Sequence, residues 1–164
     1  MVQKRAELKI LALDQSTKIT GWSLWEGTKL LKYGVLSSDV HEDNPIERMN
    51  KMYALVDGLI ADIKPKFIVI EQVQFQNNYR VYSQLSQLQG VLFAVTFRRN
   101  LPFTLIEPTA WKAFFGVELR GKKRPEQKAD TIRLVRERYG VEVSEDEADA
   151  IGIGYWASRN ISKS

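Results

Sequence analysis

The sequence predicts an α/β fold, built on one five-stranded mixed β-sheet with helices on both faces. Three apolar runs joined by short turns come first, and two further runs then alternate with longer segments of helical periodicity. Hairpin-linked strands followed by strand–helix alternation are typical of a mixed sheet covered on both sides. A chain of 164 residues can bury a sizeable core, so we expect residues 1–164 to form a single domain.

The first strand is expected at Leu8–Leu13, which is almost purely apolar. A continuous apolar run of this length is typical of a central strand covered on both faces. Gly21–Trp25 and Leu30–Leu36 predict two more strands, because the short Gly-containing segment between them suits a hairpin turn.

The rest of the chain alternates between helices and strands. Pro45–Lys64 begins with a proline, which suits a first helical turn, and carries apolar residues at three- and four-residue spacing. Phe67–Ile70 and Phe103–Ile106 predict the remaining strands, and an apolar stripe over residues 81–95 predicts a helix between them. The predicted order is β-β-β-α-β-α-β-α-α. The last two helices are expected at about Pro125–Tyr139 and Glu145–Arg159.

Carboxylates stand at three separate places from which they could converge. Asp14 ends the first apolar run and Glu71 ends the run at 67–70, so both lie at carboxyl ends of strands, where sites form in such sheets. Asp146 and Asp149 can share a face of the last helix. A charge at the end of a buried strand is costly unless something pairs with it, and converging carboxylates are typical ligands of hard divalent cations. Because two such ions can clamp the attacking and leaving oxygens of a phosphodiester, the sequence predicts a metal-dependent nuclease.

Periodicity does not settle which acidic residues of the last helix belong to this site. Ser144 and Glu147 fit a capping box, and acidic residues in a first helical turn are common for electrostatic reasons alone. Asp146 therefore also has a purely structural explanation. Glu145 lies four residues before Asp149 and can share its face, so Glu145 and Asp146 are alternatives.

The composition argues against several other kinds of site. There are no cysteines, which excludes disulfides, thiolate zinc sites and thiol catalysis. The single histidine, His41, lies in a polar stretch and is interpreted as a solvated loop residue, which argues against a serine–histidine triad. No apolar stretch approaches the ~20 residues of a membrane span. We expect a cytoplasmic protein with no membrane association and no small-molecule cofactor.

Basic residues are concentrated in one segment. From Lys112 to Lys128 there are six basic and two acidic residues, an excess equal to the net charge of +4 of the whole chain. A basic patch beside a carboxylate site suits a polyanionic substrate, and a solvated basic loop is the alternative. Three residues of the segment are expected to hold a DNA backbone with salt-dependent affinity; they are Lys122, Lys123 and Arg124.

Three motifs, in this order, resemble those of the RuvC-type Holliday-junction resolvases. They are Leu13–Trp22 (LDQSTKITGW), Val69–Val73 (VIEQV) and Asp146–Ala150 (DEADA), and the resemblance spans about residues 9–157. It implies a ribonuclease H-like fold and a homodimer that uses magnesium or manganese, two ions per active site, to nick branched DNA symmetrically. It also favours Asp146 over Glu145.

The resemblance further implies roles for individual residues. Four carboxylates become catalytic metal ligands, namely Asp14, Glu71, Asp146 and Asp149. Lys112 and Lys128 fall where the family carries basic residues near the scissile strand, so both are expected to contact DNA and assist catalysis.

One departure from the family concerns the branch point. Bacterial members place a phenylalanine directly after Glu-Gln-Val, where it wedges at the junction, whereas this chain has Gln74 there and Phe75 one residue later. Phe75 and Tyr79 are expected in a polar loop, where they could stack on unpaired bases, an interaction worth ~1–3 kcal/mol per base. Tyr82 and Trp111 are expected to be core residues. The compact, divergent sequence looks like a phage-encoded member that acts in the host cytoplasm and cuts three-way and forked DNA as well as four-way junctions.

Other functions fit parts of the pattern. The segment Asp14–Thr17 also resembles the phosphate loop of actin-like sugar kinases, but those enzymes need a second domain for which 164 residues leave no room. A non-catalytic module that binds branched DNA is an alternative, although it has no need of four clustered carboxylates near phosphates. Another ribonuclease H-like nuclease is a further alternative, and the details of the first and last motifs favour the resolvase.

Overall fold

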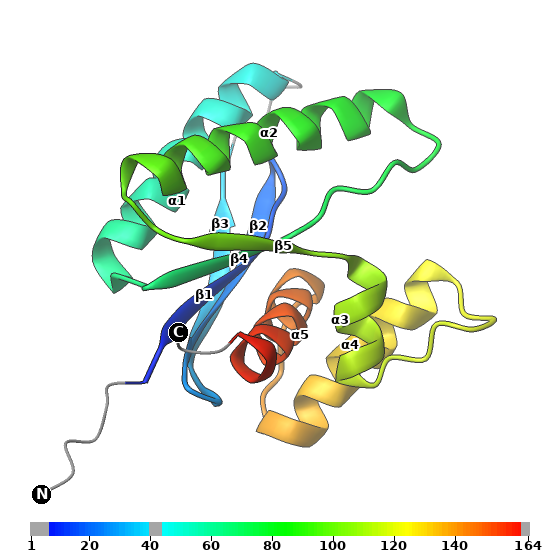
Figure 1. Ribbon diagram of the computed structural model, residues 1–164. Coiled ribbons are helices and arrows are strands. Elements are labelled where there is room, and N and C mark those ends of the chain that lie inside the picture. The colour runs from blue at the N-terminus through cyan, green and yellow to red at the C-terminus, as the bar shows by residue number, and fades with distance from the viewer. Residues whose placement is uncertain (1–6, 40–43, 162–164) are drawn as a thin grey trace, which may run out of the picture.

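The structure, a computed structural model, describes residues 7–39 and 44–161 (Figure 1); the interpretation of His41 lies outside the described residues. It contains the predicted five-stranded mixed sheet, in the order β3-β2-β1-β4-β5. β1, β2 and β3 pair antiparallel, whereas β4 and β5 continue the sheet in parallel with β1. The strands are β1 (Lys9–Asp14), β2 (Ile19–Glu26), β3 (Lys29–Ser37), β4 (Phe67–Glu71) and β5 (Phe103–Ile106).

β1 lies at the centre of the sheet, as its apolar run predicts. Successive side chains of a strand point to opposite faces, so Leu11 and Leu13 pack into one core while Ile10 and Ala12 pack into the other. All four are almost completely buried. Asp14 then ends β1 just where the strand leaves both cores.

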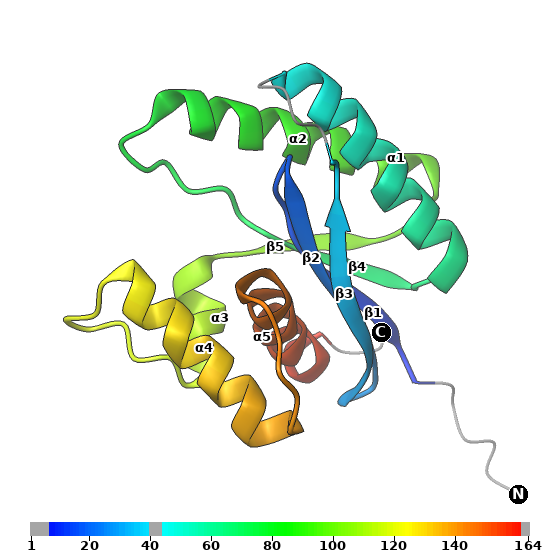
Figure 2. The same cartoon turned by 180° about the vertical axis from the view of Figure 1, so that it is seen from behind.

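Helices cover both faces of the sheet (Figures 1 and 2). Two helices share one apolar core with the sheet, and three share the other. The first pair is α1 (Pro45–Ile63) and α2 (Tyr79–Arg98), and the opposite layer is α3 (Pro108–Phe115), α4 (Arg124–Tyr139) and α5 (Glu145–Asn160). No helix within residues 7–39 and 44–161 is long and apolar enough to cross a membrane.

Two local features differ from the sequence prediction. The pattern did not predict α3, which is only 8 residues long and therefore shows little periodicity; burial of its Trp111 and Phe115 side chains stabilises it. Tyr79 is not in a loop but is the first residue of α2, because the Asn78 side chain accepts a hydrogen bond from the Val81 backbone N–H and caps the helix there.

α5 packs closely against the sheet because a glycine faces it. A Cβ atom added to Gly21 of β2 would overlap the backbone carbonyl of Asp146, so only a residue without a side chain allows this approach. One helical turn further along α5, the carbonyl oxygen of Ala150 accepts a hydrogen bond from the Ser23 hydroxyl at 2.6 Å. These contacts fix the start of α5 beside the end of β1.

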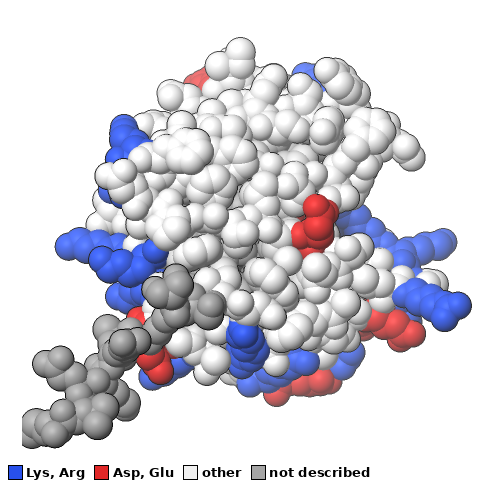
Figure 3. Space-filling model, viewed as in Figure 1, with Lys and Arg blue, Asp and Glu red and all other residues white. Residues whose placement is uncertain are grey.

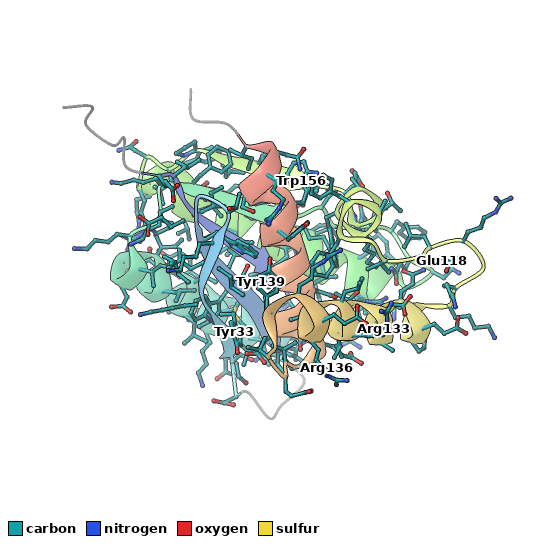
Figure 4. All side chains as sticks on the ribbon, turned by 90° about the horizontal axis from the view of Figure 1, so that it is seen from below. Tyr33, Glu118, Arg133, Arg136, Tyr139 and Trp156 are labelled. Carbon is teal, nitrogen blue, oxygen red and sulfur yellow. The ribbon has the colours of Figure 1, made fainter. Side chains whose placement is uncertain are left out.

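α4 lies beside α5, on the side away from the sheet (Figure 4). Tyr139, at its end, packs edge-on against the buried Trp25, with ring centroids 5.8 Å apart. Arg133 and Arg136 lie on the outer side of the helix in the same view, where each pairs with a nearby glutamate. The positive charge on this outer side is therefore locally balanced.

Candidate active site

The carboxyl ends of β1 and β4 open into a cleft of about 970 Å³. β1 and β4 are parallel neighbours with Leu13 opposite Ile70, so the next residue of each strand, Asp14 and Glu71, stand side by side. The start of α5 forms another wall of the cleft. All four predicted carboxylates line it, namely Asp14, Glu71, Asp146 and Asp149.

The structure separates the two alternatives on α5. Ser144 and Glu147 form the predicted capping box, which fixes where the helix begins. Asp146 lines the cleft. Glu145 does not line it; its carboxylate is 2.9 Å from the Nζ atom of Lys128 and is 55% exposed. Geometry therefore places Asp146 with Asp149 in the cleft, as the family resemblance implies.

The pKa of each of the four carboxyl groups is raised, and burial is the largest cause in every case. Burial, followed by the charges of Glu71, Asp149 and Asp146, raises the pKa of Asp14 well above its usual range. Burial, followed by the charge of Glu71, raises the pKa of Asp149 to about 7. Burial also raises the pKa of Glu71 and that of Asp146. Ionising all four groups together therefore costs free energy unless a cation joins them.

Two lysines offset part of this negative charge. Lys128 lowers the pKa of all four carboxyl groups, and Lys112 lowers the pKa of Glu71 and Asp149. Burial lowers the pKa of Lys128 itself, but the hydrogen bond and charge of Glu145 outweigh burial and raise it. Both lysines line the cleft, and the Lys112 Nζ donates a hydrogen bond to Gln127 at 3.3 Å.

One contact of Trp111 with the cleft is not predicted by the sequence. The residue is a core residue with 0% exposure, as expected. Its indole Nε1 also donates a hydrogen bond to the Glu71 Oε2 atom at 2.6 Å. The nearest signal in the sequence is the position of Trp111 directly before Lys112, but the pairing with Glu71 requires α3, which the pattern did not predict.

The basic segment divides into two parts. Arg124 lines the cleft, and its guanidinium donates a hydrogen bond to the Gln76 side chain at 2.6 Å. Lys122 and Lys123 are exposed and lie outside the residues that line the cleft. Lys and Arg side chains project from this side of the molecule, where the loop between α3 and α4 lies (Figures 1 and 3).

The predicted stacking residues lie on the other side of the cleft opening. Phe75 is 63% exposed and Tyr79 is 74% exposed, and neither lines the cleft itself. The interpretation of Tyr82 as a core residue is wrong: Tyr82 lines the cleft and packs edge-on against Phe75, with ring centroids 5.4 Å apart. The Gln74 amide donates a hydrogen bond to the Glu107 carboxylate, which holds that position against the start of α3.

The donor set of the cleft suits a hard divalent cation. Within residues 7–39 and 44–161, no three acidic or histidine side chains are arranged to hold an ion as they stand. Mg²⁺ is commonly held by only one or two carboxylates, and waters and substrate phosphates complete its shell. Four carboxylate side chains around one cleft meet that requirement.

Comparisons with known proteins identify the family and the fold. The family model of the crossover junction endodeoxyribonuclease RuvC matches residues 10–154. The RuvC crossover junction endodeoxyribonuclease of Orientia tsutsugamushi (strain Boryong) is 26% identical over 156 residues, which cover 92% of this chain and 95% of that protein.

Solved structures share the fold. T. thermophilus RuvC in complex with a Holliday junction substrate gives a TM-score of 0.73 at 16% identity, over 93% of this chain and 96% of that one. The Fowlpox virus resolvase, solved with Holliday junction DNA, gives a TM-score of 0.66 at 13% identity, over 95% of this chain and all (100%) of that one. The predicted ribonuclease H-like architecture is confirmed.

Proposed function

This chain belongs to the RuvC family of crossover junction endodeoxyribonucleases, and we propose that it is a divalent-metal-dependent endonuclease that nicks Holliday junctions and other branched DNA. The observation that carries the proposal is the meeting of four carboxylates from β1, β4 and α5 in one cleft, with two lysines beside them. A pure DNA-binding surface has no use for this negative charge, because it repels phosphates.

Each carboxylate has a role in this proposal. The charges of the other three carboxyl groups all act on Asp14, so Asp14 is the one that both ions would share. Glu71 would be a further ligand of one ion, and Asp149 and Asp146 would be ligands of the other. When bound, two Mg²⁺ or Mn²⁺ ions would supply an activated water and stabilise the leaving oxyanion of the phosphodiester.

The two lysines act on charge. Lys128 lowers the pKa of every carboxyl group in the cleft, so it helps to keep them ionised and ready to bind cations. Lys112 lies on the α3 side of the cleft. Both ammonium groups would contact the scissile strand, where they offset the repulsion between its phosphates and the four acids.

The DNA path follows from the surfaces on either side of the cleft. Arg124 in the lining, together with Lys122 and Lys123 on the exposed loop, would contact phosphates along one side. On the other side, the exposed rings of Phe75 and Tyr79 could stack on bases unpaired at a branch point. Since Gln74 is occupied with Glu107, it would not act as the wedge, and we propose less discrimination among branched DNAs than in relatives with an aromatic residue there.

The proposal includes the state of assembly. Residues 1–164 would act as one domain, because both cores are built on the same sheet. Two copies would form a symmetric homodimer, because two identical sites related by a two-fold axis account for paired nicks in a symmetric junction.

One experiment tests this function directly. The protein is incubated with Mg²⁺ and end-labelled four-way, three-way, forked and linear DNAs, and the nicks are mapped. Cleavage of the branched substrates with little cutting of linear duplex is expected. The control is Asp14→Asn, which removes a bridging ligand but little volume, so it should abolish cleavage while DNA binding persists. Wild-type cutting rates in Asp14→Asn would contradict the proposed metal site.

A further inference from the structure

We propose that Trp111 is a positioning residue for the metal ligand Glu71, an inference that rests on the proposed function. The indole N–H would hold the Glu71 carboxylate by Oε2 and so direct Oε1 toward the cation. The observation is a 2.6 Å hydrogen bond from Trp111 Nε1 to Glu71 Oε2. Among the described residues no donor bonds Oε1, and Glu71 lines the cleft.

The hydrogen bond is of a strong kind. A donor that meets an ionised acceptor forms a shorter and stronger bond than a neutral pair does. Trp111 is 0% exposed, so water does not compete for its N–H. Packing alone would be satisfied by a phenyl ring, whereas a buried indole N–H needs an acceptor, and here the acceptor is a carboxylate of the cleft.

The rest of Glu71 is already fixed, so its side-chain torsions are the freedom that remains. Its backbone pairs with Ile106 of β5, and its carbonyl oxygen accepts a hydrogen bond at 3.2 Å from the buried Gln89 side chain. A carboxylate on a fixed backbone can still rotate away from a cation. The indole removes that rotation, which is how partners behind metal ligands usually act.

Trp111 is itself held in place by α5. A Cβ atom added to Gly152 would overlap the six-membered ring of Trp111, so the indole lies directly against the α5 backbone. The same helix carries Asp146 and Asp149. Trp111 thus joins the helix that supplies two of the proposed ligands to the strand that supplies another, and it sets the position of Glu71 relative to them.

The first test uses Trp111→Phe, which keeps an aromatic ring and removes the N–H. The half-saturating Mg²⁺ concentration for cleavage should rise 10–100-fold, the usual effect of losing such a partner, while DNA binding without metal stays at its wild-type level. The matched control is Trp25→Phe. Trp25 is also 0% exposed and also loses an indole hydrogen bond, but its acceptor is the Ser23 hydroxyl. Trp25→Phe should keep the wild-type Mg²⁺ requirement. If the effect of Trp111→Phe came from packing in general, both variants would need more Mg²⁺.

The second test does not need Trp111→Phe to fold. Indole N–H signals are recorded by ¹⁵N NMR for the wild type and for Glu71→Gln. One signal should differ, because its acceptor is no longer a carboxylate, and that same signal should move when Mg²⁺ is added to the wild type. The proposal is overturned if no indole signal responds to both changes, or if Trp111→Phe has the wild-type Mg²⁺ requirement.

The two hypotheses fail in different ways. If wild-type protein cuts no branched DNA, the proposed function is wrong. The NMR experiment still shows whether the indole signal of Trp111 shifts when a cation binds at Glu71. If wild-type protein cuts junctions but the indole signal ignores Mg²⁺, the nuclease function stands and the positioning role is wrong.

Discussion

The backbone carbonyl of Asp146 occupies the space that a side chain at Gly21 would need. The contact joins the second strand of the sheet to the first turn of α5, and Asp14, which pairs with Gly21 across β1 and β2, lies at the same level. One glycine therefore sets the distance between the central carboxylate of the cleft and the acidic pair on the helix.

Gly21→Ala should displace the start of α5 and impair both stability and cleavage. The added methyl group overlaps backbone, which cannot rotate away, and overpacking of this kind costs about 1–3 kcal/mol. We expect a fall in Tm of several degrees and a large loss of junction cutting. The control is Gly90→Ala in α2, where an added Cβ meets nothing within 4 Å and should stabilise the helix by roughly 0.5–1 kcal/mol. Equal behaviour of the two variants would show that the Gly21 contact is unimportant.

Asp146→Asn should reduce cleavage far more than Glu145→Gln does. Asp146 lines the cleft, whereas Glu145 does not and pairs with Lys128 at its edge. Glu145→Gln removes a partly exposed ion pair, with the Glu145 side chain 55% exposed, and pairs near the surface are worth about 0–1 kcal/mol. Single-turnover rates on a four-way junction at saturating Mg²⁺ measure both effects. If Glu145→Gln is the more damaging change, the ligand assignment on α5 is wrong by one residue.

The metal-free protein should lose stability as the pH rises, and Asp149 should account for part of the loss. Its folded pKa of about 7 lies above the ~3.9 of an unfolded aspartate. Its stabilising contribution is therefore complete below about pH 4 and is lost as the pH rises through about 7. At 1.36 kcal/mol per pKa unit, the loss is on the order of 2–4 kcal/mol.

Thermal unfolding between pH 5 and pH 8 in EDTA checks this prediction. Asp149→Asn should raise Tm at pH 8 and have a smaller effect at pH 5. Mg²⁺ should raise the Tm of the wild type at pH 8, because it binds the folded state, and should do less for the variant. If the Tm of Asp149→Asn depends on pH as the wild-type Tm does, the Asp149 carboxyl group does not contribute to the pH dependence of stability and the prediction is wrong.

Replacement of Lys122, Lys123 and Arg124 by alanine should weaken binding to all DNA shapes by a similar factor. The slope of log affinity against log salt should flatten by roughly one unit for each lost phosphate contact. A suitable control is Arg133→Ala with Arg136→Ala, because those two side chains pair with glutamates on the outer side of α4. An unchanged slope in the triple variant would show that this loop does not contact phosphate.

Phe75→Ala should reduce cutting of branched DNA while hardly changing stability. Phe75 is 63% exposed and contacts the Tyr82 ring edge-on, so its removal loses little packing but one stacking surface, worth ~1–3 kcal/mol per base. Cleavage rates on four-way and three-way junctions, with Tm alongside, measure this. A collapse of Tm would mean that Phe75 supports the fold, and unchanged rates would remove it from the DNA path.

The parts of the fold that could be predicted are those with a strong local signal. The apolar run before Asp14 reads as a central strand because both of its faces are buried, and Ser144 with Glu147 marks the start of α5 through its own capping hydrogen bonds. α3 has no such signal. Its eight residues are helical because Trp111 and Phe115 find room between α4, α5 and the sheet, which is a property of the assembled fold.

The same distinction applies to the site. Asp14 and Glu71 were predictable because a carboxylate directly after a buried strand has few structural explanations. Helical spacing does not choose between Glu145 and Asp146; the family resemblance favours Asp146, and in the structure Asp146 lines the cleft whereas Glu145 pairs with Lys128. The contact between Trp111 and Glu71 joins residues 40 positions apart, and no local pattern encodes such a pairing.

The close packing of α5 against the sheet determines which part of the cleft can adapt to substrates of different shape. The close approach at Gly21 and the hydrogen bond from Ser23 to Ala150 hold this wall of the cleft against the sheet. The opposite rim, from Gln72 to Asn78, is largely exposed, and single side-chain bonds such as that from Arg124 to Gln76 tie it to the rest. We therefore expect the rim to change conformation when DNA branches of different angle bind, while the α5 wall stays in place. The carboxylates would then keep the same spacing whichever DNA is bound.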